Sequence, residues 1–329
     1  MITNPHIIDK LMALHLDVNI WSARKKLSPE DFAHDAVLPP DDLASLGSKR
    51  ICDPEELRVF GMLKSRAVSL LDRHGIRFLG GWAIAEDQAE NIVADLHLIE
   101  TEFIAAKEAF LTRYDQSVQE WIDKHEEWER IIADSVVSAE YVRSRIGFSW
   151  KLYRIQPPDP SDPIMAGLKN EVDGLGQTLF GEVSKVATEA WHKCFAGKTE
   201  ITRKALSPLR TIHQKLTGLS FVEPRVSPVA DLIHTAFEHL PKRGKIEGAN
   251  LLMLQGLVSL LRDTDALVEH GQKIMDGTSS TEILSLLVEG QGDRALDTTD
   301  NDNLKISADD MAPIFVDLPT QVIPSYGLW

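Results

Sequence analysis

Cysteine is almost absent from this sequence. Only Cys52 and Cys194 occur among the 329 residues, and neither stands in a spacing typical of metal ligands. Two cysteines so far apart argue against a disulfide framework and against a zinc module. They favour reduced, buried thiols in a cytoplasmic protein.

Long hydrophobic runs are absent as well. The longest, Leu251–Leu261, is interrupted by polar residues and closed by Arg262, so it is too short to cross a bilayer. Asp9 and Asp17 interrupt the apolar segment that a secretory signal peptide would need. These absences predict a soluble, cytoplasmic protein for which a membrane is not an expected partner.

Positive charge is scarce, because 35 Lys and Arg face 50 Asp and Glu, for a net charge of −15. Residues 86–145 carry 15 acidic and 6 basic side chains (net −9), and residues 276–329 carry 10 and 2 (net −8). Residues 1–85 (11 acidic, 11 basic) and 146–275 (14 acidic, 16 basic) are close to balance. Concentrated negative charge repels phosphates, so nucleic acid is not an expected partner.

Residues 86–145 contain neither proline nor glycine. A straight helix over this stretch would be roughly 80–90 Å long. Its apolar residues recur at steps of three and four, with two successive steps of four between Phe110 and Val118: Ile92, Leu96, Ile99, Phe103, Ala106, Phe110, Tyr114 and Val118. The pattern predicts a long helical arm with a coiled-coil seam and a local break in its heptads.

A second apolar seam with a similar break follows in residues 162–190. Its members are Met165, Leu168, Val172, Leu175, Leu179, Val183, Val186 and Ala190. Two matching seams predict an antiparallel helical hairpin within the chain, and homodimerisation through the same seam is the alternative.

Three short segments have the pattern of strands. Residues 14–20 alternate between apolar and polar, residues 76–84 are divided by Gly80 and Gly81, and residues 148–156 alternate again before two prolines. A helix over residues 53–74 is expected to end at Gly75 in the left-handed conformation. Further helices are expected at 199–217, 228–239 and 246–275, with Leu251–Leu261 in the bundle core.

The predicted fold class is therefore α-rich α+β. It combines a long antiparallel helical arm on a small antiparallel β base with a helical bundle and a disordered acidic tail. The predicted parts are a base (1–85), the arm (86–145), a strand with the bundle that pairs with the arm (146–275), and the tail (276–329).

The tail combines an Asp-, Asn- and Thr-rich stretch with an apolar end. The stretch up to Asp310 cannot bury enough apolar surface to become ordered. The apolar residues after it resemble a strand-addition peptide: Ile314, Phe315, Val316, Leu318 and Trp329. This peptide is predicted to dock either on another chain or on the sheet of its own chain.

No motif in the sequence indicates catalysis, a cofactor or a metal. Gly80-Gly81 and Gly174-x-Gly176 lack the spacing of a nucleotide-binding loop, and no serine or cysteine has a nucleophile's setting. Arg24–Lys26 and Lys242–Lys245 are short basic clusters that suit phosphate, an acidic partner or an ordinary solvated surface. An enzyme whose site forms only between subunits stays open as an alternative.

The aromatic residues of the arm are the strongest candidates for binding another protein. Tyr114, Trp121 and Trp128 stand where a tight coiled coil would have leucine or isoleucine, which predicts docking of a partner at these positions. The resulting hypothesis is a non-enzymatic adaptor. The alternative is a helical pore-forming or membrane-remodelling protein that inserts Leu251–Leu261.

The arm sequence also resembles a known family. The resemblance rests on Phe110-Leu-Thr-Arg-Tyr114, Trp121-Ile122, Glu127-Trp128 and Val142-Arg143, and it extends over most of residues 10–270. The family is an uncharacterised bacterial domain of unknown function. Its members are often encoded on mobile elements near MoxR-type AAA+ ATPases and von Willebrand factor A proteins.

That resemblance implies a non-enzymatic subunit of such an ATPase assembly, with a role in defence or stress. The implied partners are the AAA+ ATPase or the von Willebrand factor A protein. No catalytic residues are established for the family, so the resemblance assigns none here.

Overall fold

The structure, a computed structural model, describes residues 6–32, 46–156 and 166–296, with side chains from Ile7 to Val288. Contacts within the chain divide it into Met1–Val288 and Glu289–Trp329. The predicted division into four parts stays a prediction.

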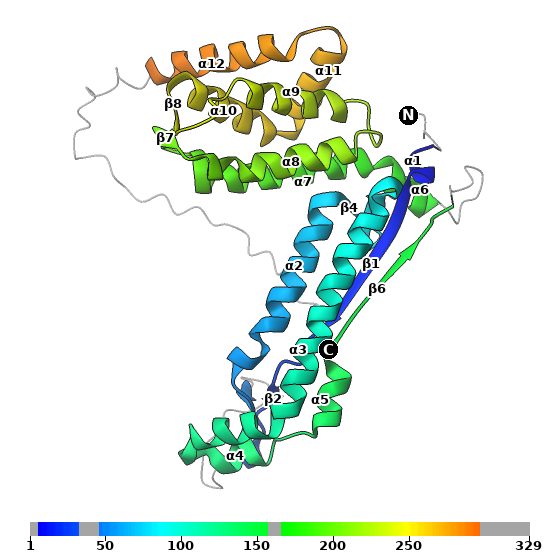
Figure 1. Cartoon of the computed structure of the whole chain (residues 1–329), viewed down its shortest axis with the longest axis vertical. Helices are drawn as coiled ribbons and strands as arrows, with labels where there is room; N and C mark the ends of the chain where they lie inside the picture. The colour runs from blue at the N-terminus through cyan, green and yellow to red at the C-terminus, as the bar shows by residue number, and fades with distance from the viewer. Residues whose placement is uncertain (1–5, 33–45, 157–165, 297–329) are drawn as a thin grey trace, which may run out of the picture. The chain divides into compact units, whose positions relative to one another are not determined.

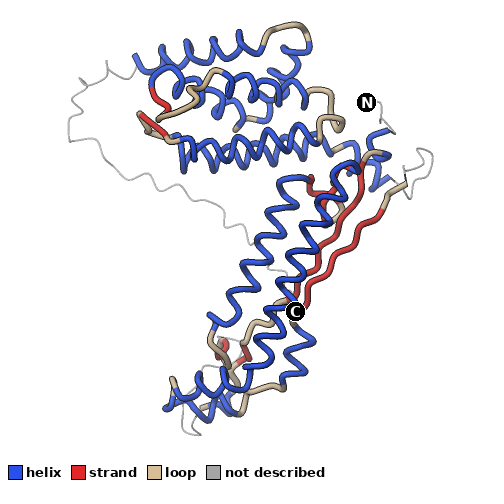
Figure 2. The backbone as a smooth tube through the Cα atoms, viewed as in Figure 1, coloured by secondary structure: helices blue, strands red, loops and turns tan. Residues whose placement is uncertain are grey.

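A four-stranded antiparallel sheet confirms the predicted β base. Its order is β4-β5-β1-β6, with the strands at Gly75–Phe78, Gly81–Ala85, Leu11–Asn19 and Gly147–Tyr153. The central strand β1 pairs with β5 through Leu14↔Trp82 and with β6 through Val18↔Phe148. Figure 2 shows β1 and β6 as the two long strands, beside the α2–α3 helix pair.

Glycines shape the hairpin between β4 and β5. Leu79 and Gly80 both have positive φ, +48° and +74°, as the mirror-image two-residue turns of hairpins require. A side chain on Gly81 would place Cβ 2.3 Å from the Leu14 carbonyl oxygen, so only glycine fits there. The left-handed end predicted at Gly75 is wrong, because Gly75 is extended (φ −126°) and already pairs in β4.

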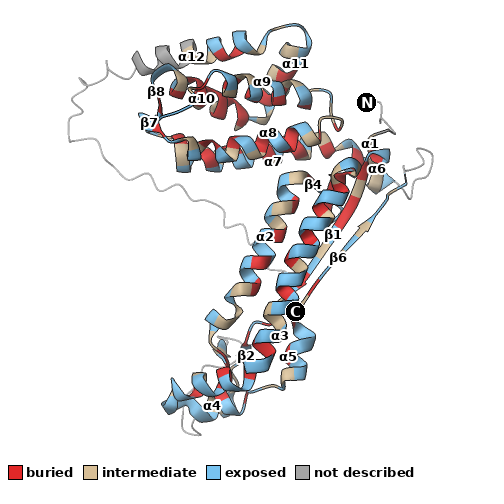
Figure 3. Cartoon of the chain, viewed as in Figure 1, coloured by how far each residue is buried: buried red, intermediate tan, exposed pale blue. Residues whose placement is uncertain are grey.

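The sheet is buried on both faces where the hydrophobic patterning is densest. In β5, Trp82 and Ile84 pack into one hydrophobic core, whereas Ala83 and Ala85 pack into a second core. Every residue of β5 is buried, and Figure 3 shows further buried residues in red along β1, α3 and α10. The sheet therefore lies between two cores, which we call the arm core and the bundle core.

The arm core forms where helices α2 (Arg58–His74) and α3 (Ala89–Asp123) cover one face of the sheet. The two helices are antiparallel neighbours (Figure 1), joined by an ion pair between Arg66 and Glu102 (2.6 Å), and Arg113 of α3 pairs with Glu56 in the 3-10 turn just before α2 (3.1 Å). The predicted seam of α3 is confirmed as its inner face, since all its members except the half-buried Ala106 are buried. Its partners are α2 and the sheet.

The prediction of one unbroken helix over residues 86–145 is wrong. After α3 the chain forms a short 3-10 helix, Glu126–Trp128, and the helices α4 (Glu129–Ala133) and α5 (Ala139–Arg145). Helix α5 folds back against α3 and buries Val142 in the arm core. A continuous helix would have left these apolar residues in water, which explains the break.

The bundle core is built from the elements after β6. They are α6 (Ala166–Asp173), α7 (Leu175–Ala190), a π turn (Trp191–Phe195), β7 (Glu200–Ile201), a 3-10 turn (Arg203–Leu206), α8 (Ser207–Gly218), α9 (Val226–Glu238), β8 (Ile246–Glu247), α10 (Gly248–Leu261), α11 (Thr264–Met275) and α12 (Ser280–Leu296). Leu251–Leu261 lies in this core, as predicted.

Two helix predictions in the bundle are corrected. The predicted helix at 246–275 is interrupted at Asp263, whose carboxylate accepts hydrogen bonds from the first amides of α11 and so caps it. The predicted hairpin between the arm and residues 162–190 is also wrong, because α7 packs against α8, α10 and β4 instead. Both α3 and α7 bury most of their seam residues against different neighbours, but the predicted seam residue Val186 of α7 is 38% exposed.

A polar network joins α2 and β4 to the bundle. Lys215 of α8 is buried, forms an ion pair with Glu182 of α7 and donates a 2.8 Å hydrogen bond to the Asp72 carbonyl oxygen. Glu182 accepts a 2.9 Å hydrogen bond from the Arg77 amide. The Asp72 carboxylate in turn accepts from the indole of Trp82 at 2.8 Å. Buried charges are thus paired where the part of the chain around the arm core meets the part around the bundle core. We call these parts the two halves and this contact the joint.

Six smaller elements complete the described part of the first unit. Helix α1 spans His6–Asp9, 3-10 helices span Pro29–Asp31, Pro54–Leu57 and Glu86–Gln88, and the strands β2 (Arg24–Lys26) and β3 (Ser48–Arg50) form an antiparallel ribbon.

Candidate functional site

Tyr114 lies in the interior of the arm core. Its ring is 1% exposed and makes edge-on contacts with Trp21 (5.7 Å between centroids) and Phe110 (5.9 Å). Its hydroxyl donates a 2.9 Å hydrogen bond to the Val137 carbonyl oxygen, and burial raises the pKa of Tyr114 to about 12. The expectation of Tyr114 as a docking residue is therefore corrected, since this side chain offers a partner no surface.

Trp121 is half-buried and ties the last turn of α3 to the ribbon. Its indole nitrogen donates a 3.3 Å hydrogen bond to the Arg50 carbonyl oxygen. The Lys124 ammonium lies 5.2 Å from the centre of its ring, and the centres of the Trp121 and His125 rings are 4.2 Å apart. Trp121 thus holds the end of α3 in place and leaves only part of its ring for a partner.

Trp128 is the one arm residue of the three that lies at the surface. It is 55% exposed at the end of the 3-10 turn that precedes α4. We define residues 123–134 around it as the acidic turn. This turn carries five acidic side chains (Asp123, Glu126, Glu127, Glu129 and Asp134) and two basic ones (Lys124 and Arg130).

The basic residues of the acidic turn are already engaged. Lys124 pairs with Asp53 at 3.6 Å, and Arg130 lies 3.7 Å from Asp134. The turn therefore presents one large aromatic ring among carboxylates, of which only Asp134 has an ion-pair partner within the described residues. An exposed tryptophan in such a setting is typical of a protein-binding anchor. The tail residues Ile314, Phe315, Val316, Leu318 and Trp329 lie outside the described residues.

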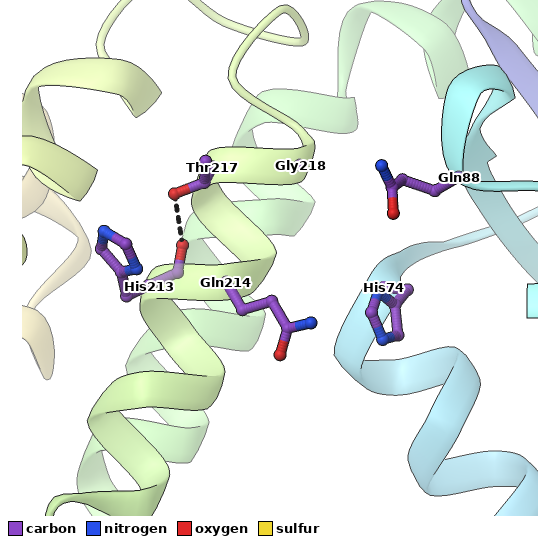
Figure 4. A pocket seen from close by; sticks show the side chains of 6 residues that line it. All are labelled: His74, Gln88, His213, Gln214, Thr217 and Gly218. Carbon is purple, nitrogen blue, oxygen red and sulfur yellow. Dashed lines mark hydrogen bonds between the residues drawn. The ribbon is translucent and has the colours of Figure 1, made fainter. Parts of the chain in front are cut away.

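A cavity of about 300 Å³ lies beside the joint between the two halves, where α2 and the start of α3 face α8 (Figure 4). Its lining residues are His74, Gln88, His213, Gln214, Thr217 and Gly218. In Figure 4 the side chains of His74 and Gln214 point toward each other, whereas the ring of His213 points away from His74.

The electrostatics of this cavity favour neutral imidazoles. Burial lowers the pKa of His74, and the nearby Arg73 lowers it further. Burial also lowers the pKa of His213, as does His234, whose ring stacks on it at 5.7 Å. The lining supplies donors and acceptors of hydrogen bonds without a paired nucleophile and base, so it does not indicate a catalytic site.

A larger cavity of about 760 Å³ opens between α1, α7, α11 and residues 220–225. Its walls combine apolar and polar side chains, and the Lys10 ammonium lies 5.7 Å from the centre of the Phe221 ring. Four charged residues line it: Lys10, Asp173, Glu223 and Arg225. The charges cancel, and Glu223 already pairs with Arg225, so the cavity indicates no particular ligand.

Metal and thiol chemistry find no support in the part of the chain that the structure describes. Within it, no group of three or more His, Cys, Asp and Glu side chains is placed to hold a metal ion. Burial raises the pKa of Cys52, whose sulfur lies 3.3 Å from the Ser117 hydroxyl. A buried thiol with a raised pKa is a poor nucleophile.

No described helix combines the length and apolar character needed to span a bilayer. The segment considered for insertion, Leu251–Leu261, forms most of α10 in the bundle core, and most of its residues are buried. Insertion would require this helix to leave the core.

The joint is the feature that the sequence patterns did not reveal. Lys215 is a single charge on the otherwise apolar inner face of α8, beside Ile212, Leu216 and Leu219. A lone lysine on such a face was the available signal. Its partners, Glu182 and Asp72, are distant in sequence and could not have been named.

Comparison with known families gives one match. The model of a family described as "Protein of unknown function (DUF3150)" matches residues 8–263. No curated protein and no solved structure matches the chain significantly.

Proposed function

The chain belongs to the DUF3150 family of proteins of unknown function, and from this premise we propose that it is a non-enzymatic adaptor. In this proposal the end of the arm binds a second protein through Trp128 and the acidic turn. The partners are those that the family resemblance implies, a MoxR-type AAA+ ATPase or a von Willebrand factor A protein.

The observation that carries the proposal is the contrast between Trp128 and the residues before it. Along α3 the seam side chains from Ile92 to Val118 are packed into the arm core, and the exposed Leu98 and Ile104 lie outside that seam. Trp128, at 55%, is the one exposed tryptophan among the described residues. A tryptophan ring presents a large apolar surface, and removing that surface from water against a partner is favourable. Binding would bury that ring.

The chemistry of the acidic turn defines the matching surface. Asp123 and Glu129 of this turn have no ion pair within the described residues, so they call for lysine or arginine side chains on the partner, and Trp128 calls for an apolar pocket between them. Charge at the rim raises the association rate and selects the partner, while the buried ring supplies most of the affinity.

A direct binding measurement tests the proposal. Purified MoxR-type ATPase and von Willebrand factor A protein from the same genome are titrated against the chain and against Trp128→Ala. Loss of an anchor residue costs about 2 kcal/mol, so we expect a dissociation constant about 30-fold higher for the variant. Leu286→Ala in α12 is the matched control, because Leu286 is equally exposed (59%) on the bundle.

The folded state serves as an internal check. An exposed side chain contributes little to stability, so the free energy of unfolding of Trp128→Ala should differ from that of the unmodified chain by less than about 0.5 kcal/mol. Equal binding by the chain and Trp128→Ala, or equal loss with Leu286→Ala, would refute docking at the arm end. Absence of binding to either partner would refute their identity.

A further inference from the structure

The ribbon beside the acidic turn carries unusual charge. Arg24 and Arg50 are directly opposite each other across β2 and β3, and Lys26 lies on the same face two residues along. All three side chains are exposed, and no ion pair connects them to any residue within 6–32, 46–156 or 166–288. We call these three residues the basic face.

This arrangement carries a cost. Like charges directly opposite across two strands are destabilising, and Arg24 and Arg50 have no described counter-ion. On the other face of the ribbon, Lys49 has one, since it pairs with the buried Asp31. Unlike Lys49, the three side chains of the basic face have no ion-pair partner within the described residues.

The ribbon is nevertheless held firmly. Ala23, just before β2, is buried in the left-handed conformation (φ +52°), which costs a residue other than glycine about 1 kcal/mol. Its carbonyl oxygen accepts a 3.0 Å hydrogen bond from the Ile51 amide, and Ile51 and Cys52 are buried in the arm core. The basic face is thus presented in a fixed position.

The acidic turn is adjacent to this ribbon. The hydrogen bond from Trp121 to the Arg50 carbonyl oxygen and the ion pair of Lys124 with Asp53 connect the two segments. Glu126 and Glu127 in the turn are exposed and, within the described ranges, unpaired. Two surfaces of opposite charge therefore lie at one end of the arm without neutralising each other.

We propose that a second copy of this chain occupies this end of the arm, with the basic face of each copy against Glu126 and Glu127 of the other. Neighbouring patches of opposite sign are self-complementary under a two-fold axis, which pairs both contacts at once. The charges of the two ends complement each other in this arrangement. Three cations beside a cluster of acids are too few for a nucleic-acid duplex.

This inference goes beyond the adaptor function and can fail separately from it. Successive side chains in a 3-10 helix diverge by about 120°, so Trp128 points away from both Glu126 and Glu127. The contact between copies thus uses the charges and leaves the ring to another partner. Trp128→Ala should consequently leave self-association unchanged.

The test is sedimentation equilibrium of the chain alone, with two charge reversals. Arg24→Glu/Lys26→Glu reverses the basic face, and Glu126→Lys/Glu127→Lys reverses the acidic turn. In a dimer of either variant, both contacts bring side chains of the same sign together. We therefore expect self-association at least about 10-fold weaker than for the unmodified chain. A 1:1 mixture of the two variants places opposite charges together again and should restore a heterodimer.

Two further variants guard the interpretation. The chain with all four substitutions has both signs exchanged and should dimerise like the unmodified chain. Lys185→Glu/Lys198→Glu makes the same change in net charge on exposed positions of the bundle and should leave dimerisation unaffected. Circular dichroism establishes that each variant is folded.

Three outcomes would overturn the proposal. They are a monomeric unmodified chain at about 100 µM, a dimer that survives both reversals, or reversals that weaken the dimer while their mixture fails to restore it. The last result would mean that these charges contact a different surface. None of these measurements involves a partner protein, so the adaptor function is judged independently.

Discussion

The arm core and the bundle core are built from different side chains. Seven of the 26 buried residues of the arm core are aromatic, against three of the 39 in the bundle core. The arm core stacks large rings along one face of α3, such as Phe60 on Phe103 at 5.0 Å. The bundle core relies on leucine, valine and isoleucine from many helices.

This difference teaches how each half is specified. A leucine-rich core tolerates exchange among aliphatic residues of similar volume, whereas interlocking rings have few substitutes. The arm core is built mainly from α2, α3 and one face of the sheet, so each ring fixes a large part of its geometry. The basic face, the acidic turn and Trp128 belong to the arm half, whose core tolerates substitution less than the bundle core does.

The first way to break the comparison is to remove one large side chain from each core. Phe103→Ala should cost about 3–5 kcal/mol of unfolding free energy, and Leu254→Ala about 2–5 kcal/mol. Both residues are completely buried. Chemical denaturation measures the loss, and hydrogen exchange shows where it falls.

The distribution of exchange is the sharper readout. Phe103→Ala should accelerate the amides of α2 and α3 more than those of α9 and α10, and Leu254→Ala should do the reverse. Equal acceleration throughout the first unit would show that the two cores unfold as one.

The second test separates the halves at their joint. Lys215→Met leaves the carboxylate of Glu182 without its cation in a mostly buried place, so we expect a loss of about 3 kcal/mol. Lys215→Met/Glu182→Gln removes the stranded charge while keeping an acceptor for the Arg77 amide, and should recover about half of that loss. Lys185→Met, on the exposed side of α7, is the control and should change stability by less than about 0.5 kcal/mol.

The third test concerns the hydroxyl of Tyr114. Tyr114→Phe keeps the ring contacts with Trp21 and Phe110 but leaves the Val137 carbonyl oxygen without its donor. A buried hydrogen bond of this kind contributes about 1 kcal/mol, which thermal or chemical denaturation detects. A change near zero would mean that water replaces the hydroxyl.

The fourth and smallest effect is a dependence on pH. Because the pKa values of His74 and His213 are lowered in the folded chain, the unfolded chain takes up protons first as pH falls below about 6.5. Stability from these groups is thus complete above pH 6.5 and is lost between 6.5 and the lowered pKa values. His74→Gln/His213→Gln should flatten this part of the stability curve.

Denaturation at a series of pH values between about 5 and 8 measures the slope. His15→Gln is the control, because His15 lies on the exposed face of β1. An unchanged slope in the double variant would show that other groups cause the dependence.

The parts of the fold that were predictable from the sequence depend on local periodicity. The inner face of α3 from Ile92 to Val118, the strands on either side of Gly80, and the burial of Leu251–Leu261 follow from the spacing of apolar residues. A seam shows which residues are buried but not against what, which is why α7 was paired with the wrong helix.

The parts that were not predictable depend on contacts between distant residues. The break after Asp123 is favoured because Val142 returns to the arm core, and no proline or glycine near Lys124 marks the break in the sequence. The same holds for the candidate site. Trp128 was identified as an aromatic residue of the arm, but only the fold separates it from the buried Tyr114.

Strand β5 has a consequence for how this chain can change over evolutionary time. Consecutive residues from Trp82 to Ala85 supply the arm core and the bundle core in alternation. A single inserted or deleted codon here would exchange the two sets, placing Trp82 and Ile84 where alanines belong. In related sequences, insertions and deletions should therefore be rarer between Gly81 and Ala85 than in the rest of the chain.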